Sequence, residues 1–175
     1  MAVGLPRRTL LQRLDLAAHE AAPAALTLVL VLVSFLPPLV PGQPGLLPSA
    51  LPASVFFWTL YRPRLMAPPA VFGLGLVQDL LSAAPLGVNT LLSLLLHAAV
   101  LTQRRVLVRQ SFLIVWVAFA LLAAALLSLG WLLRSILAVA VLPPLPAVVE
   151  LGLVVFLYPA YSWLFIRLER SLAAP

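Results

Sequence analysis

The sequence predicts an all-α membrane protein, a compact bundle of about six transmembrane helices. Hydrophobic residues make up 63% of the 175 residues, and the mean hydropathy is +1.13. Charged residues make up only 9%, whereas a soluble domain carries about 25%. The third observation is that arginine supplies every one of the 11 basic residues, and that these arginines cluster at the ends of apolar segments. Arginines in such places orient membrane helices.

Six apolar segments lie between the charges and prolines, at residues 22–39, 46–60, 69–84, 86–101, 112–133 and 147–166. A full crossing needs about 20 helical residues, so the last two segments are long enough and the second to fourth are short. We expect one transmembrane domain at 22–166, a cytoplasmic N-terminal segment at 1–21 and a cytoplasmic tail at 167–175.

The positions of the arginines predict the orientation. Ten of the eleven lie before the first segment or after the second, fourth and sixth, and Arg134 alone lies in an odd-numbered connection. Because arginine is enriched on the cytoplasmic side, both termini should be cytoplasmic. We therefore expect a multi-pass membrane protein.

The residue types argue against several function classes. There is no cysteine, and the two histidines, His19 and His97, lie far apart in the sequence and do not make a ligand set, so no metal site or cofactor is expected. No serine has a credible base and orienting acid, which argues against an enzyme. The net charge of +6 is better explained by membrane orientation than by nucleic-acid binding.

One carboxylate, Asp79, interrupts the apolar stretch at 69–101. We prefer two short helices joined by a tight turn at 84–87, with a re-entrant hairpin as the alternative. Folding back about Pro85 brings Asp79 near Asn89, Thr90 and Ser93, and Asn89 is a good N-cap for the second helix. A carboxylate within a membrane must be protonated, hydrogen-bonded or facing water. Asp79 is therefore either a structural pin for the turn, which we favour, or part of a polar pocket.

Other polar residues suggest contacts at the ends of the segments. Glu150 and Arg134 are predicted on the same side, where they could form an ion pair between the last two helices. Four aromatic residues lie near the ends of segments, as aromatic residues at the membrane interface do: Trp58, Tyr61, Trp131 and Trp163. The arginine-rich stretch 103–109 could anchor to lipid headgroups, which is the interpretation we prefer, or it could dock an acidic partner.

The stretch at 61–105 resembles the central signature of the MreD family of rod shape-determining membrane proteins. The matching residues are Tyr61, Pro63, Gly75, Leu76, Asp79, Leu80, Pro85, Leu86, Gly87, Gln103, Arg104 and Arg105. The candidate site residues, which would bind a partner or shape the fold, are Asp79, Pro85, Leu86, Gly87, Asn89, Gln103, Arg104 and Arg105.

The resemblance implies a non-catalytic scaffold of the complex that elongates the cell wall of rod-shaped bacteria, located in the bacterial inner membrane. It implies MreC as the direct partner, and MreB, RodA and the elongation transpeptidase as partners through the complex. It also implies a fold similar to the S components of energy-coupling-factor (ECF) transporters. The alternative function is therefore a small-molecule-binding transporter subunit, with Asp79, Asn89 and Thr90 lining a pocket.

Overall fold

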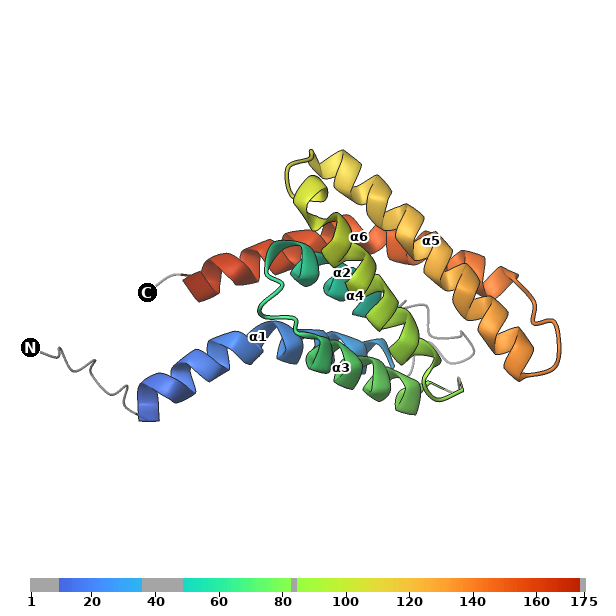
Figure 1. Ribbon diagram of the computed structural model, residues 1–175, viewed down its shortest axis with the longest axis horizontal. Coiled ribbons are helices and arrows are strands. Elements are labelled where there is room, and N and C mark those ends of the chain that lie inside the picture. Colours follow the sequence, from blue (N-terminus) through green and yellow to red (C-terminus); the bar gives the residue numbers. More distant parts are fainter. Residues whose placement is uncertain (1–9, 36–48, 83–84, 174–175) are drawn as a thin grey trace, which may run out of the picture.

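The computed structural model describes residues 10–35, 49–82 and 85–173, with side chains at 22–35, 49–82 and 85–167. The regular secondary structure of this part of the chain is all helical, as predicted. Its elements are α1 (Leu10–Ser34), α2 (Leu51–Tyr61), α3 (Pro68–Leu81), α4 (Val88–Leu107), α5 (Phe112–Leu137) and α6 (Leu145–Ala173) (Figure 1). Two stretches, Phe112–Leu137 and Leu145–Arg167, are long and apolar enough to cross a membrane.

The helices alternate in direction, so the bundle has two distinct ends. In Figure 1 the start of α1 and the end of α6 lie on the left, and the turn between α5 and α6 lies on the right. Arg104 near the end of α4 bonds the last turn of α2, which places both helix ends together. We call this the arginine-rich end, and the end where α4 begins and α5 finishes the arginine-poor end.

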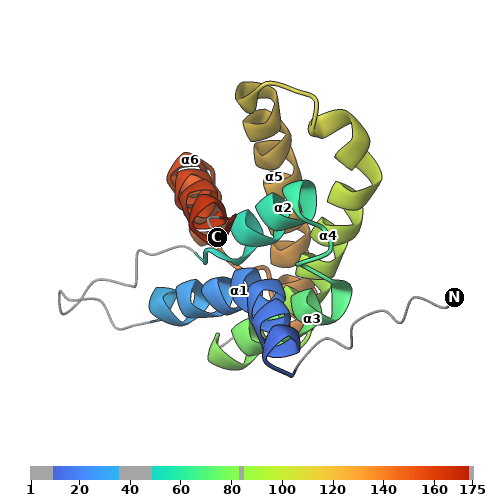
Figure 2. The ribbon, with the colours of Figure 1, turned by 90° about the vertical axis from the view of Figure 1, so that its left-hand side faces the viewer.

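The core forms around α2, which the other helices surround (Figure 2). Residues from Leu51 to Leu60 are buried apart from the partly exposed Pro52, whose fixed φ suits the first turn of a helix. Phe56 packs edge-to-face against Phe119 and Tyr158, with ring centroids 5.1 and 5.7 Å apart. An 11-residue helix is only ~16 Å long, so the helices around α2 must supply the rest of the core.

The prediction that Trp58 lies at the membrane interface is wrong. Its side chain is 1% exposed and packs against the rings of Phe57 and Phe165. Proximity to the end of an apolar segment misled the prediction, because α6 covers even the last turn of the central helix α2. Trp163 does lie on the surface, with the guanidinium of Arg167 5.3 Å from its ring.

Several helices are longer than the apolar segments that predicted them. α1 begins at Leu10, inside the stretch expected as a separate N-terminal segment, and α4 continues to Leu107. Arg104 and Arg105 therefore lie within the last turn of α4 rather than after it. The end of the first predicted segment, the start of the second, and residues 83–84, where the third segment meets the predicted turn, lie outside the described residues.

Candidate functional site

Asp79 lies in the last turn of α3 and is only 1% exposed. Its carboxylate accepts four hydrogen bonds from the beginning of α4. The backbone N–H of Asn89 donates to Oδ1 at 2.9 Å, and those of Gly87 and Thr90 donate to Oδ2 at 3.0 and 3.1 Å. The Thr90 hydroxyl donates to Oδ2 at 2.6 Å. One side chain thus joins the two helices of the hairpin.

These bonds satisfy amides that a helix cannot satisfy itself. The first N–H groups of any helix lack an intrahelical acceptor, and the first regular bond of α4 runs from Leu91 N–H to the Gly87 carbonyl at 2.9 Å. The Val88 N–H is 3.4 Å from the carbonyl of Pro85, and Asp79 accepts the amides around it. Asp79 therefore caps α4 from a different helix, next to the positive end of its dipole.

The prediction that Asn89 caps α4 is wrong. The helix begins at Val88, two residues before the start that a cap at Asn89 would give, and its cap residue Gly87 has no side chain that could form a hydrogen bond. Gly87 has φ = 93°, a left-handed conformation that glycine adopts without steric cost. Asn89 instead uses its side chain for other contacts: Nδ2 donates to Ser82 Oγ at 3.3 Å, and Oδ1 accepts from Arg134 Nη2 at 2.8 Å.

The predicted ion pair between Arg134 and Glu150 is also wrong. Arg134 interacts with Glu150 electrostatically, but no salt bridge joins them in the described part of the chain. The guanidinium reaches α4 instead, where it finds the amide oxygen of Asn89. This bond extends the connection between α3 and α4 to the last helical turns of α5.

The hairpin also requires a very close approach of two backbones. A Cβ placed on Gly75 would lie 2.6 Å from the Cα of Thr90, a separation that carbon atoms in proteins do not tolerate. Gly75 therefore lets α3 lie directly against the first turn of α4, in the manner of small residues between membrane helices. The same proximity brings Thr90 to the carboxylate of Asp79.

The remaining candidate residues are distributed over both ends of the bundle. Pro85 and Leu86 are exposed beside the turn, and Gln103 and Arg105 are exposed near the end of α4. Arg104 is half-buried and donates from Nε to the Leu60 carbonyl at 2.7 Å. It thereby caps the C-terminal end of α2, where a positive charge is favourable. The structure thus places these residues in two separate contacts rather than in one site.

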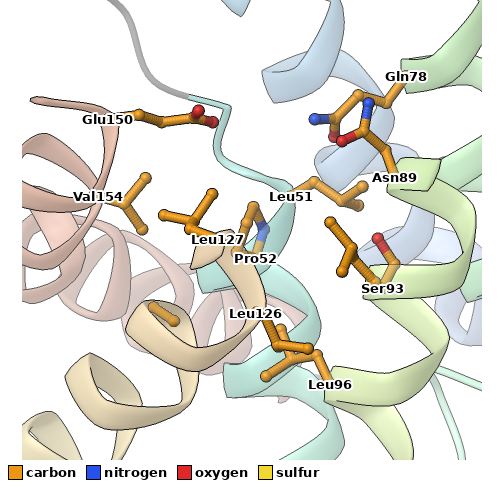
Figure 3. Close-up of a pocket in the computed structure, with 12 residues that line it drawn as sticks. Leu51, Pro52, Gln78, Asn89, Ser93, Leu96, Leu126, Leu127, Glu150 and Val154 are labelled. Atoms are coloured by element: carbon orange, nitrogen blue, oxygen red, sulfur yellow. The ribbon is translucent and has the colours of Figure 1, made fainter. Parts of the chain in front are cut away.

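A small cavity lies between the helices beside the hairpin (Figure 3). Its volume is about 40 Å³, room for roughly three water molecules. Among the residues expected to line a pocket only Asn89 does so. Ser93, which is 7% exposed, also lines the cavity, as does Gln78, which is 8% exposed and which the sequence reasoning missed. Both side chains lie on the core side of their helices. This position is the only feature of the sequence that could have indicated that they line a cavity.

A second polar contact lies deeper in the core. Thr59 Oγ1 and His97 Nδ1 are 2.8 Å apart, whereas Nε2 of the same ring is buried without a hydrogen-bond partner. No cluster of His, Asp or Glu able to hold a metal occurs in the described residues. The pair therefore links α2 to α4 without forming a recognisable reactive group.

The chain was compared with known proteins. Residues 22–167 match one family model, described as rod shape-determining protein MreD. No curated protein and no solved structure matches the chain. The match covers the hairpin and both contacts described above, as well as the helices on either side of them.

Proposed function

Because the chain belongs to the MreD family of rod shape-determining membrane proteins, we propose that it is a non-catalytic scaffold of the cell-wall elongation complex. The family assigns it a role in rod shape determination. In our proposal MreC is the direct partner, and MreB, RodA and the elongation transpeptidase are reached through the complex. The site residues maintain the shape that the partner recognises.

The hydrogen bonding of Asp79 is the observation that carries this proposal. Both carboxylate oxygens are occupied, and all four partners donate. A general acid or base needs a free position from which to exchange a proton with a substrate. Asp79 is instead committed to joining two helices, which suits a scaffold better than an enzyme.

We further propose six crossings of the bacterial inner membrane, with both termini in the cytoplasm. The distribution of the arginines and the alternating direction of the six described helices support this topology. Two of the helices reach the required length and hydropathy on their own. The shorter ones would cross in contact with their neighbours, which supply the apolar surface that they lack.

The decisive experiment depletes the protein in its own host and restores it from a plasmid. Depletion should turn rods into round cells, and the restored protein should co-purify with MreC. We expect Asp79→Leu to lose both activities, because it leaves three amides and one hydroxyl without an acceptor. Asp79→Asn keeps one oxygen and should be partly active. Leu81→Ala, a change at an exposed position in the same helical turn and outside the family signature, is the matched control.

Normal rods after depletion would contradict the role in shape. Full activity of Asp79→Leu, with normal amounts of protein in the membrane, would contradict the importance of the cap. An Asp79 variant that loses rod shape but still co-purifies with MreC would leave MreC as a partner. It would mean that Asp79 acts through another contact in the complex.

The transporter alternative finds less support in the geometry. Ligand sites usually measure about 300–1,000 Å³, whereas the cavity beside Asn89 holds about 40 Å³. Neither Asp79 nor Thr90 lines it. A ligand of vitamin size retained in native mass spectrometry, together with a dependence on an ATPase module, would reverse this preference.

A further inference from the structure

We propose that the small cavity beside the hairpin holds a cluster of ordered water molecules. The cluster hydrogen-bonds to Glu150 on α6 and to Gln78 and Ser93 on the hairpin of α3 and α4, and so joins that helix to the hairpin. The helix α6 otherwise packs mainly against α5 and α2. This inference concerns how the bundle is held together, and it does not depend on the scaffold function.

Polar side chains from three helices line this otherwise apolar cavity. Figure 3 shows the carboxylate of Glu150 extending from α6 and the amide of Gln78 extending from α3 toward the same space. Ser93 lines the cavity from α4, and leucines such as Leu51 and Leu96 form much of the remaining wall. The volume of about 40 Å³ is room for roughly three water molecules.

Three polar groups around the cavity have no hydrogen-bond partner in the described part of the chain. The carboxylate of Glu150 accepts no hydrogen bond there. The side chain of Gln78 accepts a bond from Ser49 Oγ at 2.9 Å through Oε1, but its amide N–H groups donate to no described residue. The hydroxyl of Ser93 is likewise unbonded among these residues, although Ser93 is only 7% exposed.

The hydroxyl of Ser93 gives the clearest indication of water. Hydroxyl groups within helices can bond back to a carbonyl of the preceding turn, as Thr27 does to Pro23 at 2.6 Å and Ser34 does to Leu30 at 2.8 Å. Ser93 makes no such bond within the described residues, and burying a hydroxyl without a partner is costly. Because water both donates and accepts, one cluster can satisfy the carboxylate, the amide and the hydroxyl together.

A metal cation fits the same cavity less well than water does. Calcium and magnesium take about six or more oxygen ligands, but two of the oxygens here are already engaged. The side-chain oxygen of Asn89 accepts from Arg134, and that of Gln78 accepts from Ser49. The positive charge of Arg134 also acts on Glu150, which weakens the attraction of the carboxylate for a cation. Water needs only about two to four polar partners.

X-ray hydroxyl-radical footprinting of the full chain in nanodiscs tests the proposal. A radical made from bound water oxidises the side chains beside that water, and mass spectrometry locates the added oxygen. Leu51 and Leu60 form a matched pair, because both lie on α2 and are 1% and 0% exposed, but only Leu51 lines the cavity. We expect Leu51 to be oxidised several-fold faster than Leu60. Equal rates would show that the cavity is dry and would overturn the proposal.

Two substitutions at Glu150 separate water from a cation. Glu150→Gln removes the charge but still forms hydrogen bonds, so Leu51 should still be oxidised. Glu150→Leu leaves α6 with no polar group at the cavity and should reduce the oxidation of Leu51 to the rate of Leu60. Ser128→Leu on α5, outside the cavity, is the control for added apolar bulk, and circular dichroism shows whether each variant keeps its helices. Full oxidation of Leu51 in folded Glu150→Leu, or its loss in folded Glu150→Gln, would overturn the proposal.

Discussion

Asp79 shows how a charge can be kept inside an apolar hairpin. Burying a polar group without partners is costly, but here the carboxylate and the amides of α4 satisfy each other. The stabilisation is mutual, because burying the amides without an acceptor would cost free energy just as burying the carboxylate without donors would. The residue therefore stabilises the hairpin through groups that the hairpin itself leaves unpaired.

The sequence predicted part of this contact. Folding back about Pro85 correctly placed Asp79 beside Asn89 and Thr90. It assigned the cap to Asn89, because capping preferences describe side chains local to the helix end. A cap supplied by another helix leaves no local pattern, so the true donor and acceptor could be found only from the structure.

Gly75→Ala and Gly73→Ala should have opposite effects on stability. An added methyl group at 75 would strike the backbone of Thr90, and such overpacking costs about 1–3 kcal/mol. Position 73 has no atom within 4 Å of the added carbon, so alanine there should stabilise the helix by up to ~1 kcal/mol. Unfolding of the purified protein in mixed micelles with dodecyl sulfate, followed by circular dichroism, measures both. Equal effects of the two changes would show that α3 and α4 do not make this close approach.

At the scale of elements, α2 is the helix whose environment could least be predicted. Its apolar run correctly indicated a short helix, but not one covered on every side. Lipid chains are as apolar as leucine, so hydropathy does not distinguish a residue facing lipid from one facing another helix. The place of Trp58 in the core was hidden for this reason.

Arg104→Leu should loosen the last turn of α2 more than Arg105→Leu does. Both changes remove one positive charge from the same helical turn, but only Arg104 donates to the Leu60 carbonyl. The bond is half-exposed, so we expect a loss of about 1 kcal/mol in stability. Hydrogen–deuterium exchange of peptides covering residues 55–62 should be faster in the first variant alone. Indistinguishable exchange in the two variants would mean that general charge, rather than the bond, matters.

For the molecule as far as the structure describes it, the sequence correctly indicated an all-helical fold and located the six described helices. The position of Arg134, away from the other described arginines, is also as expected. It contacts Asn89 in the first turn of α4, whereas Arg104 lies 15 residues further along the same helix, ~22 Å away. Its partner could not be predicted, because Asn89 and Glu150 lie on different helices that both approach it.

Single cysteines test the proposed orientation cleanly, since the chain contains no cysteine of its own. Arg109→Cys and Val141→Cys place thiols at exposed positions in two turns. In intact cells whose outer membrane has been made permeable, a maleimide that cannot cross the inner membrane should label only position 141. Position 109 should react after the inner membrane is opened. The reverse pattern would invert the topology, and labelling of both sites in intact cells would rule out an odd number of crossings between them.

The capping of α4 by Asp79 has a consequence for biogenesis. The ribosome makes α3 first, so its carboxylate reaches the translocon before the amides that it will bond exist. Neither helix is then stable in lipid by itself, because each carries polar groups that only the other helix can hydrogen-bond. We expect the two to leave the translocon as a pair. A chain that stops after Leu81 should then integrate less completely than one that continues through Leu107, and Asp79→Leu should reduce that difference.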